Sequence, residues 1–397
     1  MRKILLYTLM TLAAAGMASC EDFLTRDTYD QIGSDEFWKS ETDLELYANG
    51  FIQKMIPGDG TITRGDIYAD YCAVDIPTDL LRPDGNVSPD NQTGWAESNW
   101  TNLRRVNYML DNMHKCKGRV SDEIYNHYEG VARFWRAWFY YDKVQTFGAV
   151  PWYDFTIAAS DKEAMMKPRD SREYVMDKVL EDLTFASTYC LSDAKFTKGS
   201  ALINKWVALA FKSRVCLFEA AYRRYHNLTG LEITPEELYR EAAKAAKLVI
   251  DNSGCSLNTA AGKKGAYRDL FYSETPLTQE VILAVCANEK SGIFGEQNWW
   301  FNARSYGLCW SLVRSFVHTY LKQDGTPFTA AADYAVKSFA EEMEGRDLRL
   351  EQTVRGRNFL WDGKTAVADI KNLSLTGYQV IKYTLDESKY DGGAKNI

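Results

Sequence analysis

The chain has 397 residues, of which 46% are hydrophobic and 25% are charged, and its formal net charge is −7. This composition is ordinary for a folded protein with one large hydrophobic core or two smaller ones. An acidic chain without a basic cluster is a poor candidate for binding nucleic acid, and we therefore exclude that class of partner.

The N-terminus has the pattern of a bacterial lipoprotein signal. Arg2 and Lys3 precede an apolar run over residues 4–12, and residues 17–20 read Met-Ala-Ser-Cys. The run is shorter than the roughly 20 residues that a membrane-spanning helix needs. The pattern predicts a signal peptide over residues 1–19, cleaved so that Cys20 becomes a lipid-carrying N-terminus. The lipid alone would attach the mature chain, of net charge −9, to a membrane. An ordinary signal peptide followed by a chance cysteine is the alternative.

The sequence lacks the motifs typical of an enzyme or a metal site. No HExxH, G-x-S-x-G, CxxC or phosphate-loop motif is present, and the cysteines after Cys20 are widely spaced. A pair of carboxylates at glycosidase spacing is expected by chance among 54 acidic residues. We therefore predict a non-catalytic protein without a cofactor or a metal. The histidines are scattered along the chain, at His114, His127, His226 and His318.

Apolar residues at helical spacing predict long helices over residues 95–116, 121–147, 171–190, 200–224 and 234–252. Ser121 caps the second of these helices and Gly148 ends it. Thr234 begins the last one, in a capping box with Glu237. Alanines on one face of this last helix are typical of tetratricopeptide-like helical hairpins, although the pairs do not keep a strict period of about 34 residues.

The pattern changes after residue 255. Residues 280–285 form a short apolar run that predicts a strand, and residues 378–383 predict a second strand. Residues 287–311 are rich in Gly, Asn and aromatic residues, which is typical of a loop, whereas residues 312–321 predict one or two helical turns.

These elements predict a mainly α fold. After the signal peptide, one unit would run over residues 20–397. It would consist of a helical-pair scaffold over about 95–254 and a loop-rich, irregular region with few short strands over about 255–397. For the tryptophans on the predicted helices, core packing is the favoured interpretation; these are Trp100, Trp135 and Trp138.

Two segments place aromatic platforms beside polar groups, as the apolar face and the hydroxyls of a sugar ring require. The first is the predicted loop, where adjacent tryptophans cannot both face one core; its candidates are Asn298, Trp299, Trp300, Arg304, Tyr306 and Trp310. The second is the loop over residues 75–95, with the candidates Asp75, Arg82 and Trp95. Burial is an equal alternative for the first loop and for Trp95, and a solvated loop pair is the alternative for Asp75 and Arg82.

Several short motifs follow Cys20 in a specific order. They are FWKSETD at residues 37–43, FGAVP at 147–151, GRDLRL at 345–350 and Gly-Tyr at 377–378. Each motif is weak alone, but their order resembles the SusD/RagB family of nutrient-binding outer-membrane lipoproteins over nearly the whole mature chain. The acidic pair Glu21-Asp22 is similar to the surface-export signals of Bacteroidetes lipoproteins.

This resemblance implies a scaffold of tetratricopeptide-like helical pairs and ligand contacts in the two loops named above. It also implies capture of glycans, or sometimes peptides, outside the outer membrane and delivery to a SusC-like, TonB-dependent transporter. We therefore predict a lipid-anchored, exterior-facing protein that binds oligosaccharide. A helical-repeat scaffold for peptides or proteins is the first alternative, and a glycoside hydrolase is less favoured.

Family members usually continue past the Gly-Tyr motif into a helix with the sequence Arg-Tyr-Ala-Glu. This chain ends at Ile397 without that sequence. We therefore expect the C-terminal helices of the family to be missing and an apolar groove of the scaffold to be uncovered. A truncated gene, a fragment and a short variant would each account for this difference.

Overall fold

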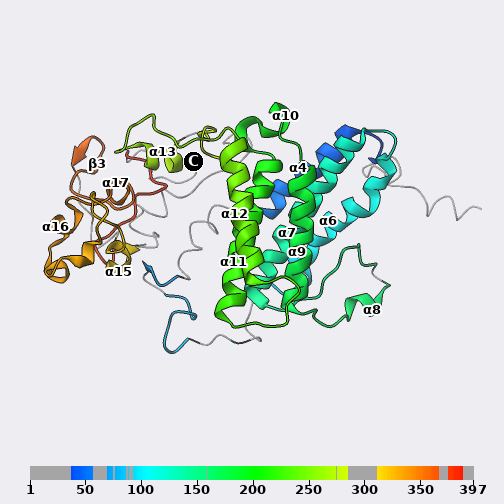
Figure 1. The fold of residues 1–397 in the computed structure, drawn as a ribbon, viewed down its shortest axis with the longest axis horizontal. Helices are drawn as coiled ribbons and strands as arrows, with labels where there is room; N and C mark the ends of the chain where they lie inside the picture. The colour runs from blue at the N-terminus through cyan, green and yellow to red at the C-terminus, as the bar shows by residue number, and fades with distance from the viewer. Residues whose placement is uncertain are drawn as a thin grey trace, which may run out of the picture.

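The structure is a computed structural model that describes residues 37–56, 69–74, 77–85, 88, 93–158, 160–273, 275–284, 311–365 and 374–387. Cys20 and the predicted signal peptide lie outside these residues. Figure 1 shows a body of long helices beside a loop-rich part with short elements. The predicted mainly α fold with few short strands is confirmed. Among the described residues, no helix is both long and apolar enough to cross a membrane.

The helical body contains six helices of twelve residues or more among the described residues. Their bounds are Glu41–Met55 (α4), Thr101–Asn112 (α6), Asp122–Phe147 (α7), Arg172–Tyr189 (α9), Lys205–Tyr225 (α11) and Pro235–Asn252 (α12). Helices α4 and α6 pack on α7, and from there each helix packs on the next in the order α7, α9, α11, α12. This succession of neighbours is the arrangement of a helical-repeat scaffold.

Short helices connect these long ones. Their bounds are Glu97–Trp100 (η3), Met113–Cys116 (η4), Lys162–Met165 (α8), Ala194–Thr197 (α10) and Lys198–Ser200 (η5). The helix that the sequence predicts over residues 95–116 is therefore a 3₁₀ turn, α6 and a second 3₁₀ turn in succession. Three of the other predicted helices are confirmed to within about one turn at each end, whereas the helix predicted over residues 200–224 begins only at Lys205.

The helix ends follow the capping pattern of the sequence. The Ser121 hydroxyl accepts a hydrogen bond from the N–H of Ile124, and Gly148 ends α7 with a φ of +69°. Thr234 and Glu237 form the predicted capping box, in which the Glu237 carboxylate accepts from the Thr234 N–H at 2.8 Å. These bonds satisfy backbone groups that would otherwise have no partner at a helix end.

The core of the helical body contains buried ion pairs as well as aromatic rings. Trp135 is fully buried, as the sequence predicts. Arg136 on α7 forms two hydrogen bonds with the buried carboxylate of Asp182 on α9, at 2.7 and 2.8 Å. Arg172 on α9 pairs in the same way with Glu219 on α11 at 2.8 Å. Each of these pairs joins two neighbouring helices at a fixed register.

The loop-rich part has its own smaller hydrophobic cluster, which includes Leu312, Val317 and Tyr378. Its helices are Ala266–Tyr272 (α13), Arg314–Val317 (α15), Phe328–Ala330 (η7), Tyr334–Val336 (η8), Phe339–Met343 (α16) and Leu348–Glu351 (α17). Its described strands form two antiparallel pairs, Cys72–Ala73 (β1) with Ser311–Leu312 (β2) and Leu360–Trp361 (β3) with Lys364–Thr365 (β4).

The sequence predictions for this part are only partly correct. The strand predicted over residues 280–285 is wrong for the described residues 280–284, because Ile282 packs against the helical body and the backbone bonds to Ser200 instead of to a strand. Residues 378–383 contribute isolated bridges at Gln379 and Val380 rather than a strand. Helix α15 confirms the helical turn predicted within residues 312–321.

Candidate functional site

An aromatic wall stands at the start of α6. Trp95 lies edge-on against Trp100, with ring centroids 5.3 Å apart, and against Phe147 at 4.9 Å. The guanidinium of Arg169 lies over the Trp95 ring, 4.5 Å from its centroid. Trp95 and Trp100 are half-buried, so part of each ring packs on the core and part borders solvent.

The opposite wall is the extended segment after Pro151, which leads to α8 (Figure 1). Side chains of the helical body fix its backbone. The Asn107 amide donates to the carbonyls of Tyr153 (3.0 Å) and Phe155 (2.9 Å), and the Tyr140 hydroxyl accepts from the Tyr153 N–H at 2.6 Å. The wall is thus held rigidly although it has no regular secondary structure.

A groove of about 770 Å³ lies between these walls. This volume falls within the roughly 300–1,000 Å³ that is usual for small-molecule sites. Aromatic and methionine side chains supply most of the apolar lining, and charged or hydroxyl groups stand among them. The apolar members are Trp95, Trp100, Tyr153, Phe155, Met165 and Met166, and the polar ones include Glu97, Thr101, Arg104 and Lys167.

The polar side chains of the groove differ in the hydrogen bonds and ion pairs that they already form within the protein. Lys167 pairs with Asp170 at 2.6 Å. The exposed Arg104 donates to the carbonyl of Ile157 at 2.6 Å and forms no ion pair within the described part of the chain. The carbonyl oxygen of the buried Asn107 side chain has no partner among the described residues. An orphaned acceptor that is fully buried is the kind of group that an ordered water satisfies.

This arrangement suits binding better than bond cleavage. Aromatic faces can stack on an apolar ligand surface, while Arg104 and Thr101 offer hydrogen bonds beside them. Glycoside hydrolysis needs two carboxyl groups about the scissile bond, whereas Glu97 is the one carboxylate among the described lining residues. The described residues also contain no cluster of three side chains that could hold a metal ion.

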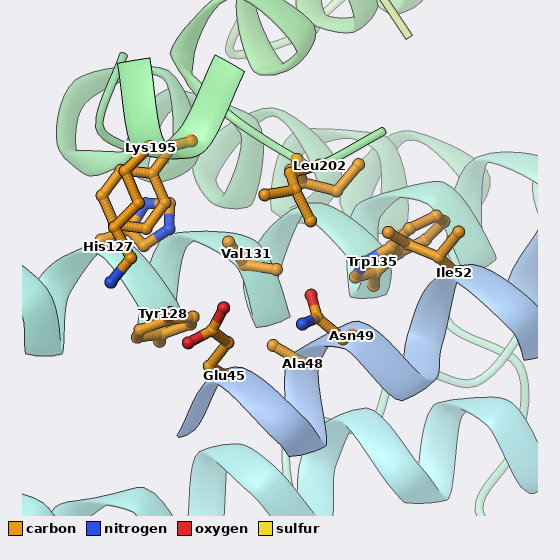
Figure 2. A pocket seen from close by; sticks show the side chains of 12 residues that line it. Glu45, Ala48, Asn49, Ile52, His127, Tyr128, Val131, Trp135, Lys195 and Leu202 are labelled. Atoms are coloured by element: carbon orange, nitrogen blue, oxygen red, sulfur yellow. The ribbon is translucent and has the colours of Figure 1, made fainter. Parts of the chain in front are cut away.

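A second hollow lies between α4, α7 and the segment around α10, and Figure 2 shows its lining side chains. Its cavity is only about 30 Å³, enough for a water or two but not for a sugar ring. Burial lowers the pKa of His127, at one end of this hollow, to about 4. Its Nδ1 atom accepts a hydrogen bond from the Leu191 N–H at 3.0 Å, so His127 is a packed residue of the core.

The sequence-predicted site residues separate into three groups. Trp95 lies in the groove. Arg82 does not; it is an exposed loop residue that pairs with Asp79 at 3.3 Å and Asp84 at 2.9 Å. The remaining candidates lie outside the described residues; they are Cys20, Asp75, Asn298, Trp299, Trp300, Arg304, Tyr306 and Trp310.

Sequence reasoning missed most of the groove. Trp100 is partly a core residue, as predicted, but it also forms part of the groove wall. Tyr153 and Phe155 lie in the non-helical segment after Pro151, and aromatic residues clustered outside a predicted helix were the available signal. Arg104 lies one turn from the start of α6 on its exposed side, and nothing in the sequence pattern distinguishes it from a solvated arginine.

Comparison with known proteins defines the class of this molecule. Residues 22–217 match a family described as starch-binding and associating with the outer membrane. SusD-like protein P2 of Formosa agariphila is 26% identical over 344 residues, which cover 79% of this chain and 61% of that protein. SusD-like protein P38 of the same organism is 25% identical over 54% of this chain and 42% of that protein. The chain thus spans about two fifths to three fifths of these curated relatives.

Solved structures share the fold. A SusD-like protein from Bacteroides fragilis superimposes with a TM-score of 0.67 at 21% identity, covering 94% of this chain and 74% of that one. A SusD-like carbohydrate-binding protein from the same species gives a TM-score of 0.67 at 19% identity, over 88% of this chain and 69% of that one. The class is that of helical-repeat proteins associated with the outer membrane. Within it, the chain belongs to the SusD/RagB family.

Proposed function

We propose that this protein binds oligosaccharide at the cell surface and delivers it to a SusC-like, TonB-dependent transporter, without breaking bonds. The groove beside Trp95 carries the proposal, because its aromatic walls suit the apolar faces of sugar rings and its polar groups suit their hydroxyls. The family description as starch-binding supports a carbohydrate ligand. A lipid on Cys20 would keep the protein beside a transporter in the outer membrane, facing the exterior.

We further propose that the segment over residues 298–310, which the sequence predicts to be a loop, contributes to ligand binding. Its Trp299, Trp300 and Trp310 would add stacking platforms, and Asn298, Arg304 and Tyr306 would add hydrogen bonds. Asp75 would add a carboxylate from the loop before Trp95. Arg82 would contribute only by leaving its ion pairs with Asp79 and Asp84.

Replacement of Trp95 by Ala tests the proposal. A glycan-array screen of the wild type first identifies a ligand, and calorimetry then measures its affinity. Loss of a stacking ring should weaken binding by about tenfold or more. Tyr225→Ala is the matched control, because Tyr225 is an aromatic residue on α11 that is 79% exposed and does not line the groove. Equal affinity of Trp95→Ala and the control would refute the groove as the site.

The triple variant Trp299→Ala, Trp300→Ala and Trp310→Ala tests the loop in the same assay. Loss of binding with an unchanged circular dichroism spectrum would support the loop as part of the site. Unchanged affinity would refute its role and leave the groove as the site.

A peptide ligand is the second candidate, and one observation favours it. Met165 and Met166 line the groove with exposed fractions of 49% and 82%, and exposed methionines are typical of surfaces that adapt to varied peptides. Binding of an extended peptide, together with no signal on the glycan array, would identify the ligand as a peptide. Release of reducing ends by the purified protein would instead show a glycoside hydrolase.

A further inference from the structure

Lys143 on α7 is a buried lysine, with an exposed fraction of 5%. Its ammonium group donates to the carbonyl oxygen of Gly94 at 2.6 Å. Within the described part of the chain, no carboxylate lies at ion-pair distance from it. A buried charge without an ion-pair partner is costly and calls for a specific reason, since an apolar side chain of similar length would pack there at less cost.

Three aromatic rings surround the ammonium group of Lys143. The distances from Nζ to the ring centroids are 5.4 Å for Phe139 and 5.6 Å for both Trp100 and Phe147. Rings at such distances attract a cation through their negative faces. Trp100 and Phe147 are also the two rings against which Trp95 packs. The same cluster therefore holds the charge of Lys143 and the main wall of the groove.

Gly94 is the backbone position directly before Trp95. Its φ of +97° is a conformation that L side chains rarely adopt, and a β-carbon there would lie 3.5 Å from the ring of Phe147. The chain thus turns sharply at Gly94, and the hydrogen bond from Lys143 fixes the carbonyl at that turn. This contact lies at the residue directly before Trp95.

We propose that Lys143 is a positioning residue for ligand binding, whose ammonium group holds the Gly94–Trp95 turn so that Trp95 forms the groove wall. The proposal rests on the proposed function of the groove. It assigns the buried charge a task that an apolar side chain could not perform, because a charge-assisted hydrogen bond is roughly twice as strong as a neutral one. Lys143 itself does not line the groove and would not touch the ligand.

The proposal implies a dependence of affinity on pH. Burial lowers the pKa of Lys143, and the neighbouring carboxylate of Asp142 partly offsets this. Among the described residues, the other charged groups near the turn include Glu97 on η3 and Arg169 over the Trp95 ring. When pH rises and the amine loses its proton, both the charge-assisted hydrogen bond and the attraction to the rings weaken. Affinity should therefore fall at alkaline pH.

Replacement of Lys143 by Met keeps the length of the side chain and removes the charge and the donor. We expect affinity for the glycan found on the array to fall roughly tenfold, and its alkaline pH dependence to disappear. Lys382→Met is the matched control, because Lys382 also lies over aromatic rings, 3.9 Å from the Phe271 centroid, but belongs to the loop-rich part and does not line the groove. Equal affinity and equal pH profiles of wild type and Lys143→Met would overturn the proposal.

Hydrogen exchange tests the turn without any ligand. We expect the backbone amides of residues 93–97 to exchange faster in Lys143→Met than in wild type, with exchange in α7 unchanged. Unchanged exchange there would refute the positioning role even if no ligand were found. Absence of glycan binding by the wild type, with faster exchange in the variant, would instead refute the proposed function alone.

A second variant covers the case in which Lys143→Met does not fold. Gly94→Ala disturbs the same turn at the residue that accepts the hydrogen bond, and it should produce the same loss of affinity.

Discussion

His127 is a buried residue whose protonation state the fold controls. It packs against Tyr128 and Phe196, and its Nδ1 atom accepts from the Leu191 N–H. Burial lowers the pKa of His127 from 6.5 to about 4, against a smaller opposing effect of Asp193. Between these two pH values the unfolded chain binds a proton that the folded chain excludes. The contribution to stability is therefore complete above pH 6.5 and is lost as the pH falls toward 4.

Replacement of His127 by Asn removes this titration and keeps a hydrogen-bond acceptor. Wild type should lose about 3 kcal/mol more unfolding free energy than the variant between pH 6.5 and 4, because each unit of pKa is worth about 1.4 kcal/mol. Urea unfolding at both pH values measures this difference. His226→Asn, at an exposed position, is the control. Equal pH slopes for wild type and His127→Asn would contradict the assignment.

At the scale of elements, the register between α7 and α9 depends on one glycine. A β-carbon at Gly130 would lie 2.8 Å from the Cys190 sulfur and 3.4 Å from the Cα of Ala186. Cys190 is fully buried, so its sulfur cannot move into solvent. The two helices approach this closely because Gly130 has no side chain, and the Arg136–Asp182 pair joins them less than two turns further along α7.

Gly130→Ala should therefore destabilise the wild type by about 1–3 kcal/mol through overpacking. In a Cys190→Ala background the same substitution should cost much less or stabilise, because alanine favours a helix over glycine by about 1 kcal/mol. A double-mutant cycle measured by denaturant unfolding isolates this coupling. Additive effects of the two substitutions would show that the contact does not limit the packing of α7 on α9.

At the scale of the whole molecule, the helical body could be predicted from the sequence and much of the rest could not. Two signals act within a single helix, namely caps such as Ser121 and Thr234 and apolar residues at helical spacing. Both can therefore be recognised in a short stretch of sequence. In the loop-rich part, contacts between distant residues determine the backbone. Arg268, for example, bonds to Asp386 and to the carbonyl of Thr384, more than a hundred positions away in the chain.

The candidate site could likewise be predicted only in part from the sequence. Trp95 is a candidate as a tryptophan in a polar loop, with burial as an equal alternative, and it lies half-buried at the groove. Its partners in the groove come from two separate segments, and their meeting depends on the bonds from Asn107 and Tyr140 to the backbone after Pro151. Those bonds connect residues 13–48 positions apart, so no local pattern reveals them.

The two parts of the molecule have separate hydrophobic clusters, and Glu342 is the central polar residue of the smaller one. Its fully buried carboxylate accepts from the Tyr378 hydroxyl, from Arg314 at 2.7 Å, and lies 3.0 Å from Nε2 of His318. Burial alone would raise the pKa of Glu342, but these hydrogen bonds outweigh it and lower the pKa. The stability that Glu342 contributes is therefore lost as the pH falls through this lowered pKa.

Glu342→Gln should weaken the loop-rich part by about 3 kcal/mol and leave the helical body intact, because the variant removes the charge that three donors share. Hydrogen exchange should show faster exchange over residues 311–365 and unchanged protection in α7 and α9. Equal loss of protection in both parts would show that they unfold as one unit.

The same variant also distinguishes the two proposed parts of the ligand site. Ligand affinity should survive if the groove beside Trp95 acts alone, and it should fall if the segment over residues 298–310 contributes, since that segment directly precedes β2 of the weakened part in the sequence.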